Sequence, residues 1–553
     1  MKEADEKRSR VEPSVIIIGA GPVGLALAAD LGWRGVRTLI VDQGTGALPQ
    51  PKTSGVNIRT MEFCRRWGLR DKIRSGGLAK DYPRDHVWAT SLTGHEIARR
   101  KVPSLKDAVP CRGAIETFMR IYQTEFDPIL RDYVLSRPSI AARYSTRCTG
   151  VDQDADGVTA TLMDVNSEKT EEVRAKYLVS CEGAGSLVRR SLGIDLLGDW
   201  VVSHSTNAYF RSAQLLNVHD KGRAFIYSVI GHDGYRGYIL ALNGTDLWVA
   251  QIRGLKGEKP TVSRDEVAET IRQFVGRDFD FELLDVMPWT RRRLVADHYG
   301  KGRIFLAGDA VHQMPPSATL GMNTGFSDAT NLSWKLDAVL AGWGGASLLD
   351  TYETERRPVA ERNASASVRI FRADQIDAFP CPAIDEDTPE GERTRNELGA
   401  RFLRGESDLP TEGLQIGYRY DSAICWPEEK PGRADSDTYE PTTYPGARAP
   451  DAWLNDDPIL DRFGLGFVLV RSGGEEMPET RSLEAAAAAS GVPLTLLDVR
   501  DPEIAELYER RLVLVRPDGH VAWRGDDLCV DPQELIDVAR GLRSSRSAPV
   551  VAH

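Results

Sequence analysis

The sequence is poor in cysteine and has no spaced pattern of metal ligands. Its seven cysteines include no Cys-x-x-Cys pair, which argues against a disulfide framework or a cysteine-bound zinc ion and fits a reduced cytoplasm. The nine histidines include no His-Glu-x-x-His motif, so we expect no metal site. Apolar runs are also short, and none reaches the roughly 18 residues that a membrane span needs. We therefore expect neither a metalloprotein nor a membrane protein.

An excess of positive charge is also absent. The 553 residues carry 70 Lys and Arg against 81 Asp and Glu, which gives a net charge of −11. A chain of this charge repels phosphates, so nucleic acids and anionic membrane surfaces are not expected partners. The composition, 41% hydrophobic and 27% charged, is typical of a globular protein, and the length predicts several domains.

What is present begins with a strand, a glycine turn and a helix. A short apolar run precedes the sequence GAGPVG (residues 19–24), and a second apolar run ends at Asp42. In this pattern Gly19 allows the tight turn, Gly21 lets backbone N–H groups approach a pyrophosphate, and Gly24 lets the helix pack on the sheet. Asp42 is placed to accept hydrogen bonds from ribose hydroxyls. We predict a dinucleotide site, because the alternative of a turn without a ligand leaves this acid unexplained.

A second turn indicates which dinucleotide binds. The apolar run 303–307 leads into Gly308 and Asp309, then two prolines, then a helix that opens at Gly321. A carboxylate after another strand of the same sheet can accept from a ribityl chain, which FAD has and NAD lacks. The helix N-terminus offers N–H groups and a positive dipole end to the flavin pyrimidine, which becomes anionic on reduction. The alternative is an αβ turn with an N-capping Asp.

Four blocks, in this order, resemble the aromatic-ring hydroxylases, FAD monooxygenases of the p-hydroxybenzoate hydroxylase type. They are the glycine turn, residues 123–130, residues 177–189, and residues 302–325 with the helix beyond. The resemblance implies FAD as cofactor, NADPH or NADH and O2 as co-substrates, and hydroxylation of a small aromatic substrate through a flavin C4a-hydroperoxide. A homodimer is common in this family, and the scattered cysteines predict a cytoplasmic location. No second glycine-rich motif occurs, which fits a family without a separate NAD(P)H domain.

The resemblance and the motifs together assign the site residues. Expected cofactor-binding residues are Gly19, Gly21, Pro22, Val23, Gly24, Asp42, Gln43, Lys52, Gln123, Glu182, Gly308, Asp309, Pro315, Leu320, Gly321, Met322 and Asn323. Pro315 is also expected to wall the flavin. Ser54 stands where several phenol-type relatives place a His or Asp near the substrate hydroxyl, although a serine alone is no base at neutral pH.

Three positions depart from the family pattern. Lys52 replaces an arginine, which keeps the charge and loses the bidentate fork. Glu182 replaces an aspartate that serves both FAD and NAD(P)H, so its reach is altered and its charge is kept. Ala318 and Thr319 replace two glycines after the prolines, which we expect to stiffen that turn.

Residues 196–290 contain short β-rich runs that predict an antiparallel sheet above the flavin. Tyr209 and Tyr227 are candidate walls of the substrate pocket, with an aromatic of the sheet core as the alternative for each. Three histidines are candidate bases, with a surface or hydrogen-bonded core histidine as the alternative: His86, His95 and His204.

The predicted fold class is α/β with α+β elements. It combines a Rossmann-like FAD-binding domain, an interleaved antiparallel-sheet substrate domain and a thioredoxin-like C-terminal domain. Because the last domain has no Cys-x-x-Cys, we expect structural support or a dimer contact there and no redox chemistry. The expected divisions are a disordered leader (1–12), the FAD-binding domain (13–195, with an excursion near 80–112, and 291–375), the substrate domain (196–290), a connector (376–444) and the C-terminal domain (445–545).

Two other functions stay open from the sequence. The same scaffold could perform epoxidation or Baeyer–Villiger oxidation on a polyketide-type substrate, because Ser54 supplies no base. A flavin-binding redox sensor that acts through a protein partner is an alternative of another class. It predicts slow NAD(P)H oxidation whatever phenol is added, and an exposed apolar patch on the C-terminal domain.

Overall fold

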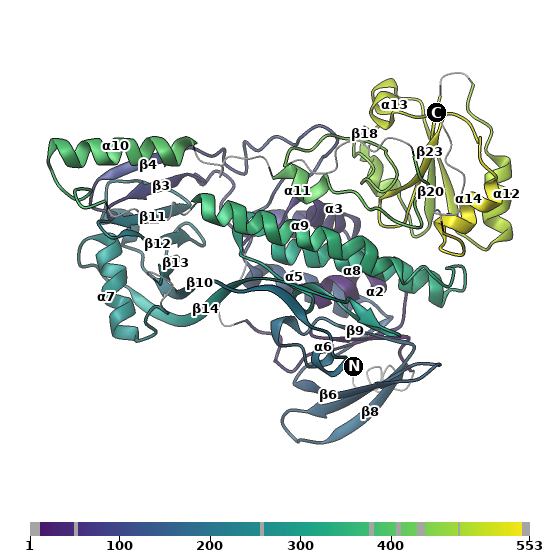
Figure 1. Ribbon diagram of the computed structural model, residues 1–553, viewed down its shortest axis with the longest axis horizontal. Coiled ribbons are helices and arrows are strands. Elements are labelled where there is room, and N and C mark those ends of the chain that lie inside the picture. Colours follow the sequence, from purple (N-terminus) through teal and green to yellow (C-terminus); the bar gives the residue numbers. More distant parts are fainter. Residues whose placement is uncertain are drawn as a thin grey trace.

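The computed structural model describes residues 12–48, 54–254, 259–374, 381–404, 411–428, 437–473 and 476–544. Figure 1 shows an elongated molecule with the C-terminal domain at one end and a large antiparallel sheet at the other. The FAD-binding half lies between them, crossed by two long helices, α8 (Leu320–Leu340) and α9 (Thr351–Asp374). Most of the predicted leader and Lys52 lie outside the described residues.

A six-stranded sheet forms the centre of the FAD-binding half. Its strand order is β15 (Gly300–Lys301), β16 (Ile304–Leu306), β9 (Tyr177–Ser180), β1 (Val15–Ile18), β2 (Thr38–Val41) and β5 (Ile140–Arg143). All neighbouring pairs are parallel except β15 with β16. The carboxyl ends of β2, β1, β9 and β16 therefore meet at one edge, which is where ligands bind in open α/β sheets.

Helices and a small sheet cover both faces of this parallel sheet. Helices α2 (Pro22–Trp33), α5 (Gln123–Ser136) and α8 contribute to its apolar core. The core also takes in the three-stranded sheet β6 (Thr146–Gln153), β7 (Val158–Asp164) and β8 (Thr170–Ala175), which the sequence analysis did not predict. Burial on both faces explains the continuous apolar runs of β1 and β2. In the described ranges, no helix is long and apolar enough to cross a membrane.

The large antiparallel sheet has eight strands. They are, in spatial order, β17 (His312–Gln313), β14 (Glu282–Ala296), β10 (Leu196–Arg211), β13 (Leu247–Arg253), β12 (Gly234–Ala241), β11 (Ile226–Gly231), β3 (His86–Ala89) and β4 (Glu96–Arg100). Helix α7 (Arg264–Val275) packs on one face and α10 (Pro389–Arg404) lies against the β3–β4 end. Because β17 begins three residues after Asp309 and pairs with β14, the second turn is joined to this sheet by backbone hydrogen bonds.

The C-terminal domain has a four-stranded mixed sheet. Its order is β21 (Leu494–Val499), β20 (Phe467–Ser472), β22 (Leu512–Val515) and β23 (Val521–Gly525), with β20 parallel to β21 and antiparallel to β22. Its helices are α12 (Arg481–Ala489), α13 (Pro502–Tyr508) and α14 (Pro532–Ala539). This is the strand order of a thioredoxin-like sheet, and the predicted fold class is confirmed.

Candidate active site

The glycine turn after β1 contains glycines of two kinds. Gly19 has φ of +102°, and a Cβ there would lie 2.4 Å from the carbonyl oxygen of Cys181. A Cβ on Gly24 would lie 1.9 Å from the carbonyl oxygen of Gly19, so both positions need glycine for the fold itself. Gly21 has an ordinary φ of −73°, and a Cβ there would meet no atom within 4 Å. Its missing side chain therefore leaves open space at the uncapped start of α2, as a bound pyrophosphate requires.

Asp42, at the end of β2, braces the glycine turn. Its Oδ2 accepts from the Ala20 backbone N–H at 2.7 Å, and its Oδ1 accepts from the Gly44 N–H at 2.7 Å. A carboxylate oxygen accepts more than one hydrogen bond, so both oxygens keep capacity for a ribose hydroxyl. The next residue, Gln43, is exposed and accepts from Arg147 Nε at 3.2 Å, which directs its amide oxygen toward the small sheet β6–β8.

Gln123 and Glu182 are both held by local hydrogen bonds. Gln123 is buried at the first residue of α5 and donates from Nε2 to Asp127 Oδ2 at 3.0 Å. Glu182 follows β9, and its Oε2 accepts from Ser186 Oγ at 2.8 Å and from the Val188 N–H at 3.1 Å. One carboxylate oxygen thus organises the start of helix α6 (Leu187–Ser191), which leaves Oε1 as the oxygen that can face a ligand.

The turn after β16 lies against the glycine turn. Gly308 has φ of +65°, and a Cβ there would lie 2.9 Å from a methyl carbon of Val23. The two predicted motifs, almost 300 residues apart, therefore touch through Val23 and Gly308. The side chain of Asp309 is exposed at this edge, on the β16 side of the glycine turn.

The buried carboxylate of Asp328 holds the same turn through a backbone hydrogen bond. Asp328 on α8 accepts from the Gly308 N–H at 3.2 Å, from His312 Nε2 at 2.8 Å and from Arg356 Nε at 2.9 Å. Burial raises the pKa of Asp328, but the interactions with His312 and Arg356 outweigh burial and hold it below its usual value. Sequence reasoning missed this set, because no fixed spacing connects strand β17 with helices α8 and α9.

The start of α8 is strained and has no side-chain cap. Ala318 and Thr319 have φ of 54° and 53°, so two non-glycine residues in a row are left-handed, at a cost of about 1–2 kcal/mol each. The first turn of the helix, Leu320 to Asn323, receives no side-chain cap from Thr319. Its N–H groups are therefore available to a ligand, and Pro315 is buried just before the turn.

The structure separates the two candidate tyrosines. Tyr209 on β10 is partly exposed. Tyr227 is 1% exposed within the core cluster that packs beneath α7, and its hydroxyl donates to the Gly222 carbonyl and accepts from the Ala224 N–H at 2.8 Å. Because its ring has no open face, the structure favours the alternative for Tyr227, an aromatic of the sheet core.

The three candidate histidines do not converge on one site. His86 stacks on Trp88 with ring centroids 3.6 Å apart and bonds Ser228 Oγ at 2.8 Å. Burial, reinforced by Arg100, lowers the pKa of His86 to about 3, so it is a poor base at neutral pH. The other two lie elsewhere, with His204 bonded to Thr290 at 3.0 Å and His95 facing an exposed Asp387 at 3.3 Å.

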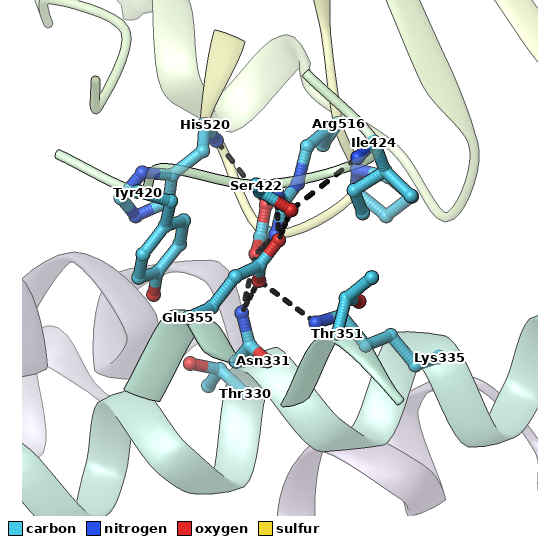
Figure 2. A network of polar contacts seen from close by, with 12 residues as sticks. Thr330, Asn331, Lys335, Thr351, Glu355, Tyr420, Ser422, Ile424, Arg516 and His520 are labelled. Carbon is cyan, nitrogen blue, oxygen red and sulfur yellow. Dashed lines mark hydrogen bonds and ion pairs between the residues drawn. The ribbon is translucent and has the colours of Figure 1, made fainter. Parts of the chain in front are cut away.

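A buried polar network joins the two long helices to the C-terminal domain. Figure 2 shows Glu355 of α9 at its centre, with Asn331 and Lys335 of α8 on one side and Arg516 and Ser422 on the other. Glu355 accepts from Lys335 Nζ at 2.7 Å and from both amino groups of Arg516 at 2.7 and 2.9 Å. Burial raises the pKa of Glu355, but Arg516 and Lys335 outweigh it, so this carboxylate stays ionised inside the protein.

A second set of ion pairs joins the C-terminal domain to α3 (Ile58–Arg66). Glu62 accepts from Arg448, and Arg65 lies 2.7 Å from Asp451. All four side chains are at most 7% exposed. The C-terminal domain is therefore part of the structural support of the FAD-binding half.

One C-terminal histidine gives a prediction about pH. His520 is 1% exposed, lies 2.9 Å from the Gly446 carbonyl oxygen and stacks on Tyr420. Burial, only partly offset by Asp518, lowers the pKa of His520 to about 3. Below the unfolded pKa of about 6.5 only the unfolded state gains this proton, so His520 makes stability fall as the pH falls, by about 1.4 kcal/mol per unit.

We expect His520→Gln to remove this dependence while keeping a donor for Gly446. Urea unfolding of both proteins at about pH 7.5 and pH 5 should show the advantage of wild type shrinking by about 2 kcal/mol at the lower pH. A difference in unfolding free energy that does not change with pH would show that His520 is protonated in the folded protein.

Two protein-family models match the chain. The model described as FAD binding domain matches residues 12–367, which is well over half of the 553 residues. The model described as aromatic-ring hydroxylase, C-terminal, matches residues 442–542. Together they include the glycine turn, the Gly308–Asp309 turn and the C-terminal sheet.

Known proteins are similar over nearly the whole chain. The FAD-dependent monooxygenase apdD of Emericella nidulans is 30% identical over 560 residues, which cover 95% of this chain and 89% of that protein. Phenol 2-monooxygenase of a Pseudomonas species is 28% identical over 586 residues, which cover 96% of this chain and 93% of that protein. The solved structure of the rebeccamycin biosynthetic enzyme RebC with reduced flavin has a TM-score of 0.88 at 36% identity, over 96% of this chain and 99% of that one. The chain therefore belongs to the aromatic-ring hydroxylases and is an FAD-dependent monooxygenase.

Proposed function

We propose that this enzyme uses NADPH or NADH and O2 to hydroxylate a phenolic or other electron-rich aromatic ring. The observation that carries the proposal is the row of groups along one edge of the six-stranded sheet. In strand order it runs from Asp42 through the open space at Gly21 to Asp309, and then to the start of α8. FAD has its adenosine ribose, pyrophosphate, ribityl chain and ring in the same order. Similarity to phenol 2-monooxygenase supports a phenolic substrate.

Each of these groups has a task that its chemistry supports. Asp42 would accept from the adenosine ribose, the N–H groups around Gly21 would bind the pyrophosphate, and Asp309 would accept from the ribityl hydroxyls. Bound FAD supplies the electron uptake from NAD(P)H and the activation of O2. The N–H groups at the start of α8 would stabilise negative charge at the ring, and buried Pro315 would exclude water there.

The test is a kinetic one on the purified holoenzyme. NADPH and NADH oxidation are followed with and without a panel of phenols. We expect one reductant and at least one phenol to raise the rate of flavin reduction many-fold. Flavin reduction that no phenol accelerates would contradict the phenolic substrate and leave the family assignment intact.

A second candidate function remains for the same site. Ser54 accepts from Arg120 Nη1 at 3.0 Å, so its hydroxyl is already engaged with a cation and contributes no base. This favours a substrate that needs no basic residue, including a polyketide-type substrate of epoxidation or Baeyer–Villiger oxidation. All three reactions add one oxygen atom and give products of equal mass, so NMR of the product distinguishes a phenol, an epoxide and an ester.

We also propose that the enzyme is a cytoplasmic homodimer. A homodimer and a cytoplasmic location are common among such enzymes, and the free, scattered cysteines support a reduced compartment. Leu197, Trp200 and Val201, each more than half exposed on β10, support an interface between two copies. Light scattering of the holoenzyme at micromolar concentration tests this, and a monomer would contradict it.

A further inference from the structure

Arg120 lies where the FAD-binding half meets the eight-stranded sheet. Its guanidinium carbon is 4.7 Å from the ring centroid of Phe118 and 4.2 Å from that of Phe225, which belongs to the core of the sheet. Its Nη1 donates to Ser54 Oγ at 3.0 Å. No sequence motif marks this residue, which lies three positions before Gln123.

The surroundings of Arg120 are fixed to the start of α8. A Cβ on Gly55 would lie 2.6 Å from the ring of Phe118 and equally close to a methyl carbon of Thr319. The Asn57 N–H donates to Asn323 Oδ1 at 3.0 Å, which ties the same loop to the first turn of the helix. Arg120 therefore stands beside the helix start at which we place the flavin ring.

The charge of Arg120 has no nearby counter-ion in the described part of the chain. Several other buried cations of this protein lie close to a carboxylate, as in the pairs Arg356–Asp328, Lys335–Glu355 and Arg34–Asp30. Within the described residues, Arg120 has no carboxylate partner, its Nε is buried without a hydrogen bond, and its Nη2 makes none. The residue as a whole is half-buried, and Nη2 is not among the buried polar atoms, so an anion can approach the guanidinium at Nη2.

Burial lowers the pKa of Arg120 to about 10, which still leaves it cationic at neutral pH. An enclosed cation that lacks a counter-ion gains more from an incoming anion than an exposed cation does, because less water screens the pair.

Arg291, on β14 of the eight-stranded sheet, is a buried arginine with a structural role. It also has no carboxylate partner among the described residues, but its amino groups donate to Ser203, Ser205 and Gln251. Aromatic rings of Trp289 and Phe371 lie at 4.3 and 4.6 Å from its guanidinium. The Nε of each arginine is buried without a hydrogen bond to any described residue, but neutral acceptors occupy both amino groups of Arg291, whereas Arg120 has a single hydrogen bond, to a serine.

We propose that Arg120 binds an ionised phenolic oxygen of the substrate and so favours the phenolate without a basic side chain. The inference rests on the proposed function and names the chemical class of its substrate, a phenol bound as its anion. The phenol releases its proton to water, the oxygen keeps the electron pair, and the guanidinium carries the balancing charge. An opposite charge within about 4–6 Å lowers the pKa of an acid by about 1–3 units. Negative charge on this oxygen raises the electron density at the ortho and para carbons of the ring, where hydroxylation takes place.

The test uses 4-nitrophenol, whose anion has its own visible absorbance, and 4-nitroanisole, its methyl ether, which cannot ionise. Difference spectra of the wild-type holoenzyme with 4-nitrophenol across pH should give a bound pKa at least about 1 unit below that of the free phenol. Arg120→Gln should bring the bound pKa back to the free value and weaken 4-nitrophenol binding by about tenfold or more, while 4-nitroanisole binds both proteins alike. Arg120→Lys should restore most of both effects.

Arg137→Gln is the matched control, because Arg137 also lies over an aromatic ring, Tyr133 at 4.5 Å, but on the far end of α5. It should change neither the affinity nor the bound pKa. FAD content and thermal stability of each variant are measured alongside.

Three results would overturn the proposal. They are an unshifted pKa of 4-nitrophenol on the wild type, equal affinity of wild type and Arg120→Gln for it, and no binding of it by the wild-type holoenzyme. These are equilibrium measurements, so they are independent of turnover. If the shift is found but no phenol accelerates flavin reduction, the anion site stands and the proposed function fails.

Discussion

Gly21→Ala is expected to yield a folded protein that no longer retains FAD. Gly21 has a φ that alanine adopts freely, and its added methyl group would meet no protein atom within 4 Å. The methyl group would instead occupy the space at the start of α2 where we propose that the pyrophosphate approaches the backbone. We expect FAD affinity to fall by at least about 100-fold, equivalent to about 2.7 kcal/mol, with little change in the unfolding temperature of the apoprotein.

Two other glycines make this prediction specific. Gly24→Ala should fail differently, with loss of folded protein, because its Cβ would lie 1.9 Å from a backbone oxygen. Gly464→Ala, in the C-terminal domain and also with no atom within 4 Å, should leave both FAD affinity and stability unchanged. The visible absorbance of the purified proteins and their apoprotein melting curves separate the three. Full FAD retention by Gly21→Ala would show that no phosphate approaches this turn.

Glu355→Gln is expected to destabilise the protein by about 3–5 kcal/mol, because it removes the buried carboxylate that two buried cations share. Lys335 and Arg516 both donate to Glu355, and all three side chains are 0% exposed. Arg516 retains Asp518, but Lys335 has only Glu355 as an ion-pair partner among the described residues. Burial lowers the pKa of Lys335 to about 8 even though Glu355 raises it. Loss of Glu355 in the variant should lower this pKa further, so that the lysine becomes largely neutral.

Glu171→Gln is the matched control for this variant. Glu171 pairs with Arg143 on the surface, where the side chains are 60% and 29% exposed, and such pairs contribute about 0–1 kcal/mol. Urea unfolding of the three proteins measures the difference. Equal stability of Glu355→Gln and wild type would show that the network in Figure 2 does not hold the C-terminal domain to helices α8 and α9.

The two turns proposed to bind FAD could be predicted from the sequence, because the residues of each turn are consecutive in the chain. Strand β1, the turn with Gly21 and helix α2 follow one another in the chain, so their residue types and spacing alone predict a strand, a glycine turn and a helix. The Gly308–Asp309 turn was predictable for the same reason. The structure adds that Val23 and Gly308 touch, a contact that depends on the parallel order of β1, β9 and β16.

Other parts of the site depend on contacts between distant segments, which a single sequence does not encode in a readable spacing. Asp328, in the middle of α8, accepts a hydrogen bond from the backbone N–H of Gly308. Arg120 stands out because aromatic rings from two different domains lie against it and because no carboxylate among the described residues pairs with it. For Tyr227 the sequence pattern was visible but ambiguous, because an aromatic residue in a strand has the same sequence surroundings whether it faces a pocket or the core.

The C-terminal domain was expected to give structural support or a dimer contact. Its ion pairs with α3 and its network with Glu355 fit structural support. The alternative of a redox sensor with a docking domain gives way to the family assignment, because the relatives that match the chain are monooxygenases.

The most direct test of the central claim is a turnover experiment under isotopically labelled O2, with the phenol that best accelerates flavin reduction. The account predicts a product that carries one labelled oxygen on its ring, in an amount that matches the NAD(P)H consumed. Consumption of NAD(P)H that yields only hydrogen peroxide with every phenol, or a hydroxylated product without label, would contradict it.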